Sequence, residues 1–185
     1  MKNVVAIAGI ETIRNDAGEV LRYADTFLNN VHTWIAENPA ATVKVLDARH
    51  YTKCDNPVQA VWKDVVASFD KIDTLIYSGH SSPESLICFS HIRLDLTVEQ
   101  RYFRIDFDYT TAPWSDDASF YIYGCQAGGE HGVVWPTSIA QCIANQIKRT
   151  VYAYTSKSYQ KESPKGCFHQ VSDDKIGLVK FIPNK

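Results

Sequence analysis

The sequence predicts an α/β fold, a three-layer sandwich in which a mainly parallel sheet carries helices on both faces. Two observations predict it. Short, continuous apolar runs alternate along most of the 185 residues with stretches whose apolar residues recur at helical spacing. Strands that alternate with helices form right-handed crossovers, which place consecutive strands parallel and cover the sheet with helices. The length suits one domain, so we expect residues 1–185 to form a single unit.

Six apolar runs have the composition of buried strands, because they are short, continuous and rich in Val, Ile, Leu and Tyr. In chain order they cover residues 4–8, 42–46, 73–77, 120–123, 150–154 and 176–182.

Apolar residues at helical spacing predict three helices between these strands. The stripes extend from Leu21 to Ile35, from Val58 to Phe69 and from Ile139 to Ile147. Asn38 and Pro39 end the first helix, and Asn56 before Pro57 gives the second an N-cap and a first-turn proline. Trp62 in the second stripe is interpreted as core.

Residues 81–117 interrupt this rhythm. Two short apolar runs are followed by an acidic, aromatic stretch from residue 103 to residue 117. The pattern predicts short antiparallel strands and a small helix, which form a β-hairpin insertion after the third core strand.

Composition excludes several classes of protein. Nineteen Lys and Arg residues against 21 Asp and Glu residues give a formal net charge of −2, so no basic excess is available for a nucleic-acid backbone. The longest apolar runs are about five to seven residues, far short of the ~20 that span a membrane. No cationic, apolar leader is visible, so we expect a cytoplasmic protein without nucleic-acid or membrane partners.

The cysteines are Cys54, Cys88, Cys125, Cys142 and Cys167. Their odd number and wide spacing argue against a disulfide framework. Neither Cys88 with His91 nor Cys167 with His169 has the spacing or the ligand count of a metal site. We therefore expect reduced thiols, no metal and no cofactor.

Two reactive side chains follow predicted strands. His80 comes after strand 73–77, and Cys125 comes after strand 120–123. Ligands of open α/β sheets bind beyond the carboxyl ends of the strands, and neighbouring strands lie about 5 Å apart. If the two strands are neighbours, His80 and Cys125 face one crevice as general acid/base and nucleophile.

The residues around Cys125 favour a reactive thiol. Gly124 precedes it, and residues 127–129 read Ala-Gly-Gly. These residues permit a tight turn with exposed backbone N–H groups, which would stabilise a thiolate and hold an oxyanion.

These segments resemble the caspase-like (clan CD-type) cysteine peptidases. Residues 77–80 read Tyr-Ser-Gly-His and residues 123–128 read Tyr-Gly-Cys-Gln-Ala-Gly, which look like the histidine and cysteine turns of that group. The group includes gingipain, clostripain and toxin self-cleavage domains. The layout is most similar to the uncharacterised caspase-like domains of large bacterial surface proteins. The resemblance covers about residues 70–158 well, and the earlier residues only in the order of strands and helices.

The resemblance implies a caspase-like sheet and a role for each matching residue. Cys125 would be the nucleophile of a cysteine endopeptidase that acts on a peptide or protein substrate without a cofactor, and His80 would protonate the leaving amine. Backbone N–H groups around Cys125 and His80 would bind the oxyanion, with Ser81 and Gly124 as the candidates. The strand that follows the cysteine helix would line a specificity pocket, here with Tyr154, Thr155 and Ser156.

Aromatic and acidic side chains near these loops are further candidates for contact with a substrate. Trp114 and Trp135 would either form the floor of a substrate cleft or pack in the core. Four acidic residues would form a solvated rim that attracts basic substrate segments. They are Asp106, Asp108, Asp116 and Asp117.

Two other functions remain open. The glycine that usually follows the histidine of the family is Ser81 here, whose side chain narrows the crevice, so a catalytically silent binding or scaffold module is the main alternative. Residues 79–83 also partly match the nucleophile elbow of serine hydrolases, with Ser81 as nucleophile and Asp117 and His169 as partners, although Pro83 stands in place of the last glycine.

A phosphatase loop is a weaker match. Residues 125–131 have its cysteine, but His131 stands where an arginine would clamp phosphate in a bidentate manner.

Overall fold

The computed structural model describes residues 1–89, 95–129, 137–162, 168–172 and 177–184, and it confirms the predicted α/β sandwich. A six-stranded sheet has the order β13-β10-β9-β5-β1-β4. Its strands are β1 (Asn3–Ala8), β4 (Thr42–Asp47), β5 (Ile72–Ser78), β9 (Trp114–Tyr123), β10 (Thr150–Ala153) and β13 (Val179–Phe181). Every neighbouring pair is parallel except β13, which runs antiparallel to β10.

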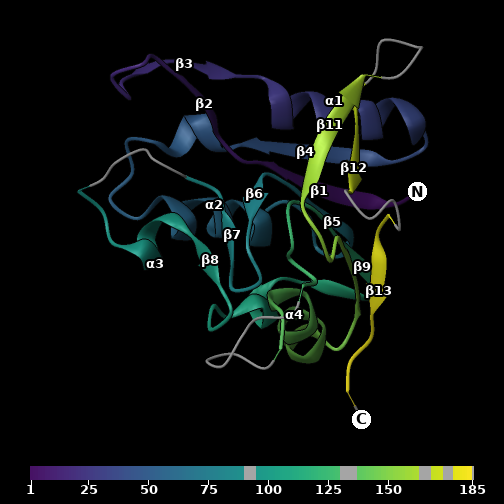
Figure 1. Ribbon diagram of the computed structural model, residues 1–185. Helices are drawn as coiled ribbons and strands as arrows, with labels where there is room; N and C mark the ends of the chain where they lie inside the picture. Colours follow the sequence, from purple (N-terminus) through teal and green to yellow (C-terminus); the bar gives the residue numbers. More distant parts are fainter. Residues whose placement is uncertain (90–94, 130–136, 163–167, 173–176, 185) are drawn as a thin grey trace.

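Helices cover both faces of this sheet (Figure 1). They are α1 (Thr26–Glu37), α2 (Pro57–Val66) and α4 (Ile139–Ile147). The first packs over a small apolar cluster that contains Val4 and Ile76, whereas α2 and α4 pack on the opposite face over the larger core that contains Leu75 and Phe120. Successive strand residues point to opposite faces, so β5 contributes to both clusters. The Asn56 side chain accepts a hydrogen bond from the Gln59 N–H, which confirms the predicted N-cap.

The first predicted helix is wrong in its first turn. Residues near Leu21 belong to an antiparallel hairpin of β2 (Glu11–Arg14) and β3 (Val20–Ala24). Gly18 has a φ of +81° and donates its N–H to the carbonyl of Asn15, which closes the turn. Leu21 is 63% exposed, so its helical spacing to the residues of α1 is coincidental.

The insertion contains the expected short antiparallel strands. They are β6 (His80–Ser81), β7 (Ser85–Ile87) and β8 (Phe103–Arg104), with the short helix α3 (Val98–Arg101) before β8. The following core strand is longer than predicted, because β9 begins at Trp114. Residues 114–117 therefore belong to the main sheet.

The end of the chain differs from the prediction in two ways. An antiparallel hairpin of β11 (Ser158–Glu162) and β12 (Phe168–Ser172) was not expected, and β12 lies against α1. The last strand is shorter than residues 176–182 and covers Val179–Phe181. No helix within the described ranges combines the length and the apolar character needed to cross a membrane.

Two tryptophans of the sequence prediction pack in the core. Trp62 is 5% exposed and donates its indole N–H to the Thr111 hydroxyl at 2.7 Å, which confirms its core assignment. Trp114 donates its indole N–H to the Tyr109 carbonyl and lies at the opposite end of β9 from Cys125. Of the two alternatives for Trp114, packing against the core is therefore correct, and a place in the floor of a cleft beside Cys125 is not. Trp135 lies outside the described residues.

An ion-pair network ties the start of α1 to the end of β4. The Arg49 guanidinium contacts the Asp47 carboxylate and the Asp25 carboxylate, each at 2.6 Å. Burial opposes ionisation of the Asp47 carboxyl, but the hydrogen bonds from Arg49 outweigh it and hold the pKa of Asp47 below its ordinary value. The network fixes the first turn of α1, which carries Phe27, at the carboxyl edge of the sheet.

Asp47→Asn should lower the free energy of unfolding by roughly 1–3 kcal/mol at about pH 7. A carboxyl with a lowered folded-state pKa stabilises above its unfolded pKa, and that contribution is lost as the pH falls through the folded value. Urea unfolding of both proteins at a series of pH values measures this difference. A stability difference that stays constant below about pH 3 would contradict the assignment.

Candidate functional site

His80 and Cys125 follow two adjacent strands in the same register. β5 pairs in parallel with β9, and Ser78 is the partner of Tyr123 at the carboxyl end of the ladder. The Gly79 N–H donates to the Tyr123 carbonyl at 3.2 Å and extends the pairing by one residue. The expectation that the two strands are neighbours is confirmed. Each reactive residue therefore lies two positions beyond a paired residue.

The backbone at His80 is held from the core beneath it. The Tyr77 ring is fully buried, and its hydroxyl donates to the His80 carbonyl at 2.7 Å. A Cβ at position 79 would collide with that hydroxyl, so only glycine fits between them. Burial raises the pKa of the Tyr77 hydroxyl well above its ordinary value, which keeps it a hydrogen-bond donor.

Two residues, one from β2 and one from α1, hold the His80 imidazole. Nε2 lies 3.1 Å from Oε2 of Glu11, and the ring meets the edge of Phe27 with centroids 5.0 Å apart. The side chains of His80 and Glu11 are 42% and 29% exposed, so the pair remains accessible from solvent.

Sequence analysis missed Glu11. Three consecutive strands of the sheet, β1, β5 and β9, are followed by Glu11, His80 and Cys125 respectively. The available signal was an acidic residue three positions past the first predicted strand, at the same edge as His80. The sequence pattern assigns residues 9–20 to no element, so the direction of this stretch could not be predicted.

Ser81 links the histidine turn to the cysteine turn. Its hydroxyl donates to the Cys125 carbonyl at 2.7 Å. A Cβ at position 124 would collide with that hydroxyl, and it would also approach the Gly79 carbonyl. Gly124 is therefore required because Ser81 occupies the space beside it.

The amide groups that follow Cys125 are already used by the fold. The N–H groups of Gln126 and Gly128 donate to the carbonyls of Ser156 and Tyr154, each at 2.9 Å, and Gly129 donates back to Gln126. Gln126 takes a φ of +55° to make this turn. The expectation that this turn presents exposed backbone N–H groups is thus wrong for these three residues. Two of these amides donate to the segment after β10, and the third, that of Gly129, donates within the turn.

A cavity of about 500 Å³ opens beside the same turn. Its walls include Gly128 and Gly129, Ser138 and Gln141 of the α4 region, and Thr155. Of the predicted pocket residues, Thr155 lines this cavity, whereas Tyr154 is 4% exposed and Ser156 offers its carbonyl to the turn. Burial raises the pKa of the Tyr154 hydroxyl to about 12.

The structure places Ser81 and Asp117, two residues that the serine-hydrolase hypothesis requires, far from one another. Ser81 is 8% exposed with its hydroxyl engaged by a carbonyl, so it is a poor nucleophile. Asp117 lies in the amino-terminal half of β9, roughly 20 Å along the strand from the carboxyl edge where Ser81 lies. Asp116 is equally distant, and it pairs with Arg149 at 3.2 Å, so these two acids do not form a rim around Cys125.

The remaining thiols do not join the site. Cys54, Cys88, Cys125 and Cys142 are free cysteines, and burial raises the pKa of the Cys88 thiol far above its ordinary value. His91, His131 and Cys167 lie outside the described residues, so the weaker metal and phosphatase readings cannot be placed. Within the described part of the chain, no three His, Cys, Asp or Glu side chains are grouped to hold a metal ion.

No protein-family model matches the chain, and no curated protein has a significantly similar sequence. We therefore argue function from the geometry of this chain.

Ser81→Ala should lower the free energy of unfolding by about 1 kcal/mol and speed hydrogen exchange in residues 124–129, because the Cys125 carbonyl loses its donor. Ser68→Ala is the matched control, since the Ser68 hydroxyl also donates to a backbone carbonyl, that of Asp64 at the end of α2. Chemical denaturation and exchange mass spectrometry measure both effects. Equal exchange in the turn of both variants would refute the link.

Proposed function

We propose that this chain is a caspase-like cysteine endopeptidase in which Cys125 is the nucleophile and His80 is the general acid and base. The observation that carries the proposal is the shared register of the two residues beyond the adjacent strands β5 and β9. The hydroxyl bridge from Ser81 to the Cys125 carbonyl supports it, because it holds the two turns together.

The proposed reaction has two stages. The Cys125 thiol gives its proton to His80, the sulfur attacks the carbonyl carbon of the peptide bond, and the carbonyl electron pair moves onto oxygen. The electron pair then returns from oxygen, and the C–N bond breaks as His80 gives that proton to the leaving amine. In the second stage His80 takes a proton from water as the hydroxide attacks the thioester. The C–S bond breaks, His80 returns the proton to the Cys125 thiolate, and the released carboxylic acid loses its own proton to solvent.

The oxyanion of each stage would be held by backbone N–H groups at Cys125 and Ser81, beside Gly124. The amides of Gln126, Gly128 and Gly129 are bonded elsewhere and have no part in it. This arrangement needs no metal and no organic cofactor.

Glu11 would position the histidine. Its carboxylate lies at hydrogen-bonding distance from Nε2, which favours the tautomer with the proton on that nitrogen. Nδ1 is then the nitrogen that exchanges a proton with the reacting groups. The same carboxylate would stabilise the imidazolium that forms when the thiol ionises.

The cavity beside the cysteine turn would receive part of a peptide or protein substrate. Its described walls carry hydroxyl and amide groups from Thr137, Ser138, Gln141 and Thr155 and no charged side chain. These groups suit hydrogen bonding to a neutral polar side chain. The four cysteines in the described part of the chain are free thiols, which supports a reducing compartment such as the cytoplasm, where the nucleophile stays reduced.

A catalytically silent binding module is the second candidate. The observation that favours it is the Ser81 side chain, which is packed against Gly124 where the oxyanion would lie. Such a module would bind peptides in the same crevice and cleave none of them.

Cys125→Ala should abolish peptide cleavage, with turnover reduced by about 10³-fold or more, while the fold is retained. Proteome-wide cleavage-site profiling of wild type and variant measures this loss. Cys142→Ala, which removes a half-buried thiol in α4, is the control that keeps activity. In the wild type, iodoacetamide should label Cys125 before Cys54 and Cys142, and His80→Ala should slow that labelling. Uniform slow labelling together with no cleavage would favour the binding module.

Glu11→Gln should lower kcat by up to about 100-fold and leave KM nearly unchanged. The histidine loses the carboxylate that orients it, whereas the cavity that would bind the substrate is unchanged. Glu11→Asp should recover part of the loss, and Glu19→Gln on the same hairpin is the control without contact to His80. Steady-state kinetics and ¹⁵N spectra of the His80 ring follow rate and tautomer separately. An unchanged tautomer in Glu11→Gln would remove the positioning role.

A further inference from the structure

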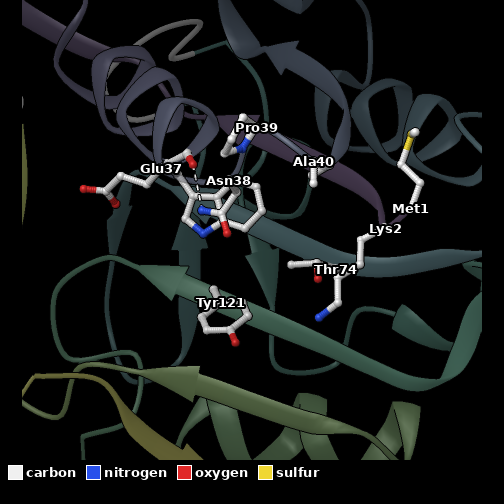
Figure 2. A pocket seen from close by; sticks show the side chains of 10 residues that line it. Met1, Lys2, Glu37, Asn38, Pro39, Ala40, Thr74 and Tyr121 are labelled. Atoms are coloured by element: carbon white, nitrogen blue, oxygen red, sulfur yellow. Dashed lines mark hydrogen bonds between the residues drawn. The ribbon is translucent and has the colours of Figure 1, made fainter.

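A second pocket lies at the opposite edge of the sheet from His80 and Cys125. It has a volume of about 610 Å³ and lies between the end of α1, the turn into β4 and the strands β5 and β9, which contribute Thr74 and Tyr121 (Figure 2). Volumes of this size are typical of small-molecule sites. Its rim is fixed by the Asn38 side chain, which donates to the Trp34 carbonyl at 2.8 Å.

Aromatic rings form two of its walls. Trp34 comes from α1 and Tyr121 comes from β9. Tyr152 of β10 stacks on Tyr121 with centroids 4.7 Å apart and ring planes inclined by 9°. Tyr152 is the cross-strand partner of Tyr121, so it covers the ring face that is turned toward β10. The stack also holds Tyr121 in place, so a flat ligand meets a preorganised ring.

One buried hydroxyl belongs to a residue that lines this pocket and has no hydrogen-bond partner among the described residues. Thr74 of β5 is 4% exposed and lines the pocket, and no described residue offers its hydroxyl a hydrogen bond. Buried polar groups in native proteins are almost always hydrogen-bonded, so an orphaned one calls for a partner from outside the chain.

The charges of the lining are divided between its two ends. Figure 2 shows Lys2 beside Thr74 and Glu37 at the opposite side. An ammonium and a hydroxyl next to each other provide two donors for one anionic group. A ligand carboxylate would therefore bind at the Thr74 end of the pocket, and the ring attached to it would pack against the aromatic walls.

We propose that this pocket binds a planar aromatic carboxylate, with its ring between Trp34 and Tyr121 and its carboxylate on Thr74 and Lys2. The pocket does not share residues with the proposed peptidase site, so the two proposals stand or fall separately. Ligand binding should be the same in wild type and in Cys125→Ala.

The probe is 2-naphthoate, titrated into ¹⁵N-labelled protein and followed by NMR. A ligand of this size should bind with a Kd of about 1 mM. Naphthalene-2-carboxamide, which has the same rings without the charge, and cyclohexanecarboxylate, which has the charge without the flat ring, should each bind at least about 5-fold more weakly. The shifted resonances should include Thr74, Tyr121 and the Trp34 indole.

Thr74→Val and Tyr121→Leu should each weaken binding of 2-naphthoate about 5- to 10-fold. Tyr23→Leu, which changes an exposed tyrosine of the β2–β3 hairpin, should leave it unchanged. Thr74→Val should also leave the thermal unfolding midpoint equal or higher, since it removes a buried hydroxyl that has no hydrogen-bond partner among the described residues. No shifts at roughly 10 mM probe, full binding in both pocket variants, or equal affinity for the carboxamide would each overturn the proposal.

Discussion

The parallel pairing of β5 with β9 is the constraint on which the candidate site depends. Both strands are buried and end at the same edge, so His80 and Cys125 arrive together without any contact between their side chains being needed to bring them there. A slip of one residue in this ladder would turn every side chain of one strand to the other face of the sheet. The two apolar clusters on the two faces resist that slip, and hydrophobic packing therefore sets the spacing of the reactive groups.

Backbone hydrogen bonds determine which groups remain available for chemistry. The turn after Cys125 is hydrogen-bonded to the segment after β10 through the N–H groups of Gln126 and Gly128, so these amides are not available to a ligand. Ser81 does the same for the carbonyl of Cys125. The side chains of His80 and Glu11, in contrast, are partly open to solvent. The rigid part of the site is main chain, and its accessible part is side chain.

The core strands and the helices α2 and α4 could be predicted because their signals are local. Continuous apolar runs, an Asn-Pro N-cap and helical stripes need no knowledge of neighbours. The strand order was only assumed, and the partners of the site could not be predicted. Glu11 contacts His80 from the first strand of the β2–β3 hairpin. That hairpin was not predicted, because the apolar spacing at Leu21 indicated a helix. The use of the Gln126 and Gly128 amides depends on residues about 30 positions later in the chain, which local patterns do not encode.

The Tyr77 hydroxyl connects the interior of the protein directly to the main chain of His80. Tyr77 belongs to the large apolar core together with residues of α2 and α4, and its ring is fully buried there. The interior of the protein therefore fixes the main chain from which the imidazole extends. Grafting the histidine and cysteine loops onto another sheet would transfer the reactive groups without the support that orients them. An engineered copy of this site would have to include the tyrosine and the glycine that accommodates it.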